Sequence, residues 1–153
     1  MPLKELKKRP SIEQNKRLEK AYVQFTTLLT ELRKRSLPEE ITTPINTEID
    51  TINSVSDSEK ELKKQLRKSQ SNILRMLEKE LKIVAKNHYR NLWMAIGMSV
   101  FGIPLGVAFG TSLGNMGLLG VGLPIGMVIG LAVGITMDKK ALEAGRQLDL
   151  EIK

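Results

Sequence analysis

Few side chains in this sequence could do chemistry, and their spacing does not bring them together. His88 is the only histidine and the chain has no cysteine, so a zinc site would need several carboxylates around one imidazole. The acidic residues alternate with lysine and arginine, as in Glu59, Lys60 and Glu61, which is typical of solvated helix faces with ion pairs. We therefore expect no enzymatic activity, no cofactor and no metal site.

The dominant feature is a repeat of glycines inside a stretch without charge. Residues 91–137 contain no acidic, basic or histidine side chain. They include two runs with glycine at every fourth position, and neither run has the G-x-x-x-x-G-K-[ST] pattern of a phosphate loop. The first run is Gly102, Gly106, Gly110 and Gly114, and the second is Gly122, Gly126, Gly130 and Gly134.

The length of this stretch predicts a transmembrane hairpin over residues 91–137. About 20 apolar residues span the hydrocarbon core of a bilayer, so the stretch is long enough for two crossings, about 91–113 and 118–137. The turn is expected at 114–117, its most polar point. A soluble, buried hairpin is the alternative, and it is disfavoured because glycine costs up to about 1 kcal/mol relative to alanine in a helix.

The glycines are predicted to form the packing face of the hairpin, because missing side chains let two helix backbones approach closely. If the chain folds back on Met116, the two runs face each other in register. The expected pairs are Gly110 with Gly122, Gly106 with Gly126, and Gly102 with Gly130. In that case the outer apolar faces are left for lipid or for a neighbouring copy.

Residues 93–148 also resemble a known kind of protein. The G-x-x-x-G ladder, the G-N-M-G turn, the second ladder and the ending M-D-K-K-A-L-E-A-G-R-Q-L are similar to the membrane region of small bacterial glycine-zipper proteins with two transmembrane helices. The resemblance implies a bacterial cytoplasmic membrane. It implies no activity, since its motif is structural rather than chemical.

Aromatic and basic residues are placed as expected at a membrane interface. Tyrosine and tryptophan prefer the headgroup level, and basic side chains reach lipid phosphates. Basic residues flank both predicted crossings and the turn has none, so both termini are expected in the cytoplasm. The predicted interface residues are Tyr89, Trp93, Lys82, Lys86, Arg90, Lys139 and Lys140.

The net charge of +7 belongs to residues 1–90, because 138–153 carries as many acidic as basic side chains. A basic stripe ends at Arg90, next to the first crossing, and lacks interleaved aromatics for stacking bases. Anionic lipid is therefore the favoured partner of this stripe, and nucleic acid is disfavoured.

Residues 11–90 are predicted to be a cytoplasmic helical domain after a loose basic leader, 1–10, and residues 138–153 a cytoplasmic tail. Helices are expected at about 12–36, 45–53 and 59–90, the first and last opened by capping pairs, Ser11 with Gln14 and Ser58 with Glu61. Prolines predict a loop before 45, and a break at 53–58 is left open. The first helix carries an apolar seam at Leu18, Tyr22, Phe25, Leu29 and Leu32.

Together these patterns predict an all-α protein: a helical hairpin or three-helix bundle followed by a transmembrane glycine-zipper hairpin. The favoured function is a non-enzymatic membrane protein whose glycine hairpin anchors a basic cytoplasmic domain for self-assembly or partner binding. The alternative is an oligomeric pore or a membrane-permeabilising protein of toxin, holin or channel type. A homo-oligomer and a protein partner of the cytoplasmic helices both stay open.

Overall fold

The structure, a computed structural model, describes residues 2–9, 12, 15–56 and 58–152. They form an all-α protein with a short two-stranded sheet, which confirms the fold class expected from the sequence. The chain divides into two compact units, residues 1–84 with 148–153 and residues 85–147. The first is called the helical domain and the second the glycine hairpin.

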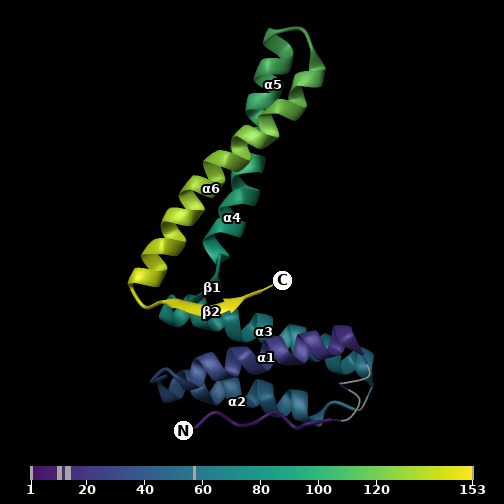
Figure 1. Cartoon of the computed structure of the whole chain (residues 1–153), viewed down its shortest axis with the longest axis vertical. Helices are drawn as coiled ribbons and strands as arrows, with labels where there is room; N and C mark the ends of the chain where they lie inside the picture. Colours follow the sequence, from purple (N-terminus) through teal and green to yellow (C-terminus); the bar gives the residue numbers. More distant parts are fainter. Residues whose placement is uncertain (1, 10–11, 13–14, 57, 153) are drawn as a thin grey trace. The chain divides into compact units, whose positions relative to one another are not determined.

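Within the described residues, the helical domain contains α1 (Lys16–Arg33), α2 (Glu39–Ser54) and α3 (Glu59–Leu81), as seen in Figure 1. Helix α3 contacts both α1 and α2, and side chains from all three share one hydrophobic core. The three-helix arrangement is therefore the one observed.

The predicted tail is not a free tail. Its end forms strand β2 (Gln147–Glu151), which pairs with β1 (Val84–Lys86). Leu148 and Leu150 of β2 are buried in the core of the helical domain. Alternation of apolar and polar residues in Q-L-D-L-E is the period of a strand with one buried face.

The predicted seam on α1 lies in this core. Leu18, Phe25 and Leu32 are completely buried, Leu29 is nearly so, and Tyr22 packs against the cluster while partly exposed. Burial raises the pKa of the Tyr22 phenol, and the positive charge of Arg9 opposes that shift. The seam is thus filled by the domain's own side chains rather than left for a partner.

Helix α1 begins at a different cap from the one expected. The side-chain oxygen of Asn15 accepts hydrogen bonds from the backbone N–H groups of Arg17 (3.0 Å) and Leu18 (3.3 Å). Asparagine is as good a cap as serine, because its oxygen reaches the same unpaired donors. The predicted pair, Ser11 with Gln14, lies outside the described residues.

Helix α2 is longer than expected, since it begins at Glu39 and contains Pro44. Proline costs a helix one hydrogen bond and some steric strain. Here Pro38 precedes the helix with φ −59°, and the first turn carries two acidic side chains that favour the positive end of the helix dipole. The buried side chain of Ile41 adds packing against the core, so tertiary burial outweighs the local penalty.

The chain does break between α2 and α3, at the segment left open by the sequence. Helix α2 ends at Ser54 and α3 begins at Glu59. Within the described chain Ser58 makes no side-chain capping bond. Instead the hydroxyl of Ser56 donates to the Glu61 carboxylate at 2.6 Å.

Helix α3 ends at Leu81, so the expectation of one helix over 59–90 is wrong. Lys82 has a left-handed backbone (φ 56°), and the N–H of Ile83 donates to the carbonyl of Leu77 at 3.1 Å, so a left-handed residue ends the helix and one of its last carbonyls is still paired. Strand β1 follows, and Asn87, also left-handed (φ 61°), precedes the next helix. The sequence V-A-K forms the strand, and its β-branched Val84 is buried there.

The expected loose leader is also ordered where it is described. Residues 2–9 run beside α2 (Figure 1) and are bonded to Asn46 and Asn53 of that helix. Leu3 and Leu6 pack against the core. The sequence alone does not predict this order, because two leucines in a short charged segment are too few to show the period of a helix or a strand.

The glycine hairpin has two arms. The first arm is α4 (His88–Gly97), a π-helical turn η2 (Met98–Gly102) and α5 (Ile103–Ser112). The second arm is a 3₁₀ turn η3 (Met116–Leu118) and α6 (Leu119–Glu143). The arms contain almost all of the predicted crossings, 91–113 and 118–137, and extend beyond them at the ends away from the turn.

Candidate membrane-spanning glycine hairpin

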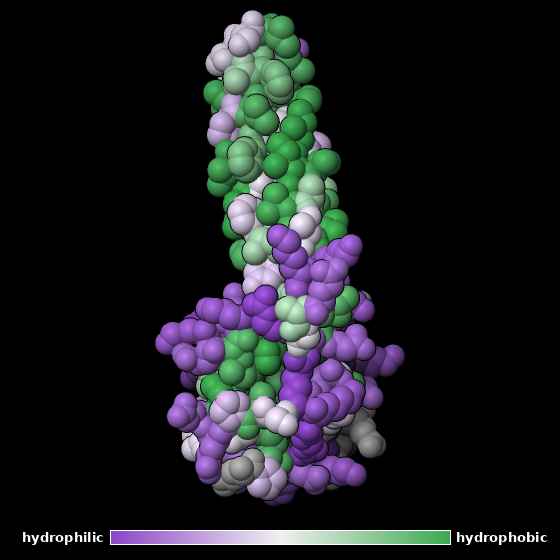
Figure 2. Space-filling view, turned by 90° about the vertical axis from the view of Figure 1, so that its left-hand side faces the viewer, coloured by the Kyte–Doolittle hydropathy of each residue, from purple (hydrophilic) through white to green (hydrophobic). Residues whose placement is uncertain are grey.

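Both arms are long and apolar enough to cross a membrane, by length and composition. Their large apolar side chains point outward: Val128 is 65% exposed, Val100 56% and Ile103 53%. Figure 2 shows hydrophobic residues over the face of the hairpin in view. A helix in the core of a soluble protein would bury such side chains, so the exposure runs against the soluble alternative.

The residues buried between the arms are glycines. A methyl group on Gly122 would lie 2.1 Å from the carbonyl oxygen of Gly102 and 2.4 Å from the nitrogen of Gly106. One on Gly126 would lie 2.4 Å from the carbonyl oxygen of Gly97 and 2.5 Å from the nitrogen of Gly102. At these positions backbone lies directly against backbone, which is possible only because neither residue has a side chain.

The register differs from the expected one by one helical turn. Gly122 lies against Gly106 rather than Gly110, and Gly126 against Gly102 rather than Gly106. In the same way, Gly130 lies against Trp93 rather than against Gly102.

The physical reason is the position of the turn. The chain reverses at Gly114, which has a left-handed backbone (φ 62°), two residues before the expected pivot, Met116. A Cβ at Gly114 would meet no atom of the described chain within 4 Å, so this glycine serves the turn and not the seam. Gly110 is left facing Asn115 and Met116.

Gly97 belongs to the packing face and was missed from the sequence. It stands five residues before Gly102, so a regular α-helix would rotate it away from a four-residue ladder. The π-helical turn over Met98–Gly102 absorbs the extra residue. A Cβ on Gly97 would lie 2.3 Å from the Gly126 carbonyl oxygen and 2.8 Å from the Gly130 Cα.

Beyond Gly97 the seam continues with glycine on the second arm only. A Cβ on Gly130 would lie 2.0 Å from the carbonyl oxygen of Trp93. One on Gly134 would lie 2.5 Å from that of Tyr89. The close approach therefore runs along most of the first arm.

A carboxylate closes the base of the hairpin. Asp138, near the end of the second arm, is 7% exposed. Its oxygens accept hydrogen bonds from the backbone N–H groups of Tyr89 (3.1 Å) and Arg90 (2.9 Å), and the Gln147 amide donates to its carbonyl at 3.3 Å. A carboxylate at the positive end of a helix accepts hydrogen bonds from unpaired N–H groups and interacts favourably with the helix dipole. Asp138 therefore caps α4 from the other arm.

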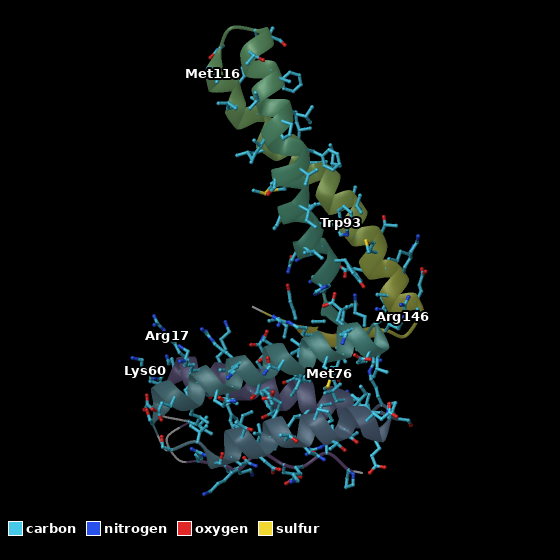
Figure 3. The ribbon with its side chains drawn as sticks, turned by 180° about the vertical axis from the view of Figure 1, so that it is seen from behind. Arg17, Lys60, Met76, Trp93, Met116 and Arg146 are labelled. Atoms are coloured by element: carbon cyan, nitrogen blue, oxygen red, sulfur yellow. The ribbon has the colours of Figure 1, made fainter. Side chains whose placement is uncertain are left out.

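The predicted interface residues fall at this base or next to it in the chain. Tyr89 and Trp93 are half-buried on α4, and the Tyr89 ring lies edge-on to His88 at 5.1 Å. Figure 3 shows Trp93 on the first arm, away from Met116 at the turn. Lys139 and Lys140 are exposed on α6, while Lys82 follows α3 and Lys86 ends β1, so these two are not on the helix that carries Arg90.

The hairpin is a packing interface between two helical arms. In the part of the chain that the structure describes, no group of three or more histidine, aspartate or glutamate side chains could hold a metal ion. Comparison of the chain with protein-family models, with curated proteins and with solved structures finds no match.

Proposed function

We propose that the chain is a non-enzymatic integral membrane protein in which the glycine hairpin anchors the basic helical domain. The observation that carries the proposal is the division of the hairpin into two faces. Glycine backbones fill the inner face, and exposed apolar side chains cover the outer one. In water the outer face would be costly, and in lipid it needs no partner.

The same geometry favours an anchor over a pore. Three of the few hydroxyls in the arms donate to carbonyls of their own helix: Ser99 to Ala95, Thr111 to Val107 and Thr136 to Ala132, each at 2.9 Å. Such bonds leave little polarity to line a channel. The glycines are already occupied within one hairpin, so a pore would have to assemble through apolar outer faces.

The proposed location is a bacterial cytoplasmic membrane with both termini in the cytoplasm. The membrane type comes from the resemblance of residues 93–148, and the orientation from the basic residues at the base of the hairpin and their absence at the turn. Anionic headgroups are the proposed contacts of these residues. The helical domain then serves self-assembly or binding of a protein partner.

Reconstitution in liposomes tests the anchor against the pore. We expect purified protein to stay with the vesicles after alkaline extraction and to release no trapped dye at high protein-to-lipid ratio. Dye release by the wild type that Gly106→Leu and Gly126→Leu both abolish would refute the anchor-only function. Reporters fused to each terminus test orientation, and a terminus outside the cytoplasm would contradict it.

A further inference from the structure

The helical domain holds residues 2–9 in a way that resembles peptide recognition. The Asn46 side chain accepts from the backbone N–H of Lys4 at 2.8 Å and donates to the carbonyl of Pro2 at 3.1 Å. The amide therefore pairs with both polar groups of the extended backbone, much as a neighbouring strand would.

A second asparagine repeats the contact. Asn53 accepts from the N–H of Lys7 at 2.9 Å and donates to the carbonyl of Glu5 at 3.1 Å. The two asparagines are seven residues apart on α2, which is about 10.5 Å along a helix axis. The two contacted N–H groups are three residues apart, about 9 Å in an extended threefold chain, so the spacings match.

The side chains of the segment follow the same period of three. Leu3 and Leu6 turn toward the core, Arg9 is buried, and the lysines between them are exposed. The guanidinium of Arg9 donates to the carbonyls of Ile52 (3.2 Å), Asn53 (3.0 Å) and Ser56 (3.1 Å) at the C-terminal end of α2. A cation there also suits the helix dipole.

We propose that α2 carries a docking surface for an extended Leu-x-x-Leu-x-x-Arg segment, and that the N-terminal segment of a second copy of this chain occupies it in trans. Two backbone clamps, two apolar positions and one arginine site define the ligand. Residues 2–9 fit all five, so a second copy can make every contact that the segment makes within one chain. Exchange of an identical element between copies then loses no contact.

Membrane anchoring supplies the concentration that such exchange needs. A tethered segment has an effective concentration on the order of millimolar at its own docking surface, so segments of dilute copies in solution cannot compete with it. Copies confined to one membrane have a higher local concentration, so their segments can compete. The inference therefore rests on the proposed anchoring role and gives its self-assembly a specific surface.

Single cysteines test the exchange, because the chain has none of its own. The ammonium of Lys4 pairs with the Asp50 carboxylate at 2.5 Å, and both side chains are about half exposed, so cysteines at these positions report docking with little disturbance. Lys4→Cys and Asp50→Cys are placed on separate full-length chains with tags of different size and co-expressed. A short crosslinker is then applied to the membranes.

We expect a cross-chain product from Lys4→Cys with Asp50→Cys that exceeds the product from Lys4→Cys with Lys68→Cys, an exposed position on α3. Replacing Asn46 and Asn53 by alanine removes four backbone hydrogen bonds and should lower the product roughly tenfold or more.

A cross-chain yield equal to that of the Lys68→Cys pair would overturn the inference. A yield that the alanine substitutions leave unchanged would overturn it as well. Both cysteines on one chain give the intramolecular reference. Fractionation of the same samples separates this inference from the anchoring role. Chains that sediment with membranes but crosslink only within themselves keep the anchor and lose the exchange, whereas soluble chains refute the anchor itself.

Discussion

The carboxylate of Asp138 accepts a hydrogen bond from the backbone N–H of Arg90 at 2.9 Å, although 48 positions separate them in the sequence. A second bond, 3.1 Å long, comes from the N–H of Tyr89. One side chain near the end of the second arm thus caps the first turn of the first arm. The base of the hairpin is closed by this cap, as its far end is closed by the turn at Gly114.

Replacing Asp138 by alanine should weaken the hairpin. The change leaves two partly buried N–H groups without their acceptor, and loss of a helix cap costs about 0.5–2 kcal/mol. Asp138→Asn keeps one acceptor oxygen and should cost less. Unfolding in detergent micelles, followed by circular dichroism, measures the effect. Lys139→Ala, at the exposed neighbouring position, should be close to neutral, and an equal loss there would argue against a specific cap.

Two glycines of α6 should respond in opposite ways to alanine. A Cβ at Gly122 would lie 2.1 Å from a backbone oxygen, whereas one at Gly120 would meet no described atom within 4 Å. Gly122→Ala forces the arms apart, and overpacking of this kind costs about 1–3 kcal/mol. Gly120→Ala should be neutral or stabilising by up to about 1 kcal/mol, since alanine favours helix.

Thermal unfolding of these two variants in the same micelles gives the comparison. Each carries one added methyl group on the same helix, so differences in expression or detergent affinity are minimised. Equal stability of Gly120→Ala and Gly122→Ala would mean that the arms do not approach as closely as the structure describes.

Acid should weaken the helical domain partly through Glu31. The Lys34 ammonium donates to its carboxylate, which lowers the pKa of Glu31 below its ordinary value of 4.5, and the N–H of Asp149 adds to the shift. A carboxyl with a lowered folded pKa stabilises the fold above its unfolded pKa, and that contribution is lost as pH falls through the folded pKa.

Glu31→Gln should therefore reduce the loss of stability on acidification below about pH 4.5, while changing little the pH dependence at neutral pH. Denaturant unfolding at a series of pH values measures this. Glu19→Gln, on the exposed side of α1, is the control, and an identical acid profile for both variants would exclude a special role for Glu31.

Periodicity in the sequence predicts that three helices and two apolar arms exist and that glycines recur along each arm, because each of these features depends on spacing along one element. It does not predict where α2 begins or where α3 ends. The register depended on which residue made the turn. Met116 was the centre of a polar, glycine-flanked motif, but only Gly114 takes the left-handed backbone that reverses the chain. The choice of Gly114 over Met116 as the point of reversal is a tertiary outcome, and it shifts every pair by one helical turn.

The other features that the sequence did not predict also depend on tertiary contacts. The pairing of Asn46 with residues 2–9, the cap by Asp138 and the burial of Leu148 each join segments far apart in the chain. Periodicity within one segment contains no information on such contacts. For Gly97 a signal did exist, namely its five-residue distance from Gly102, which is the spacing that a π-helical turn accommodates.

Deleting one residue should separate the role of the π-helical turn from that of helix length. Val100 lies between Gly97 and Gly102, and Val128 lies between Gly126 and Gly130; both valines are exposed. Without Val100 the glycine spacing becomes four, so a regular α-helix keeps the seam on one face. Without Val128 the spacing becomes three, and the seam beyond it turns by about 100°.

We expect the chain without Val100 to keep the hairpin, with a small change in unfolding temperature. The chain without Val128 should lose roughly 3 kcal/mol or more, because several close glycine contacts are replaced by bulkier residues at once. Thermal unfolding and protease resistance in micelles compare the two. Greater damage from removing Val100 would show that the π-helical turn itself, and not the alignment of Gly97 with the seam, stabilises the first arm.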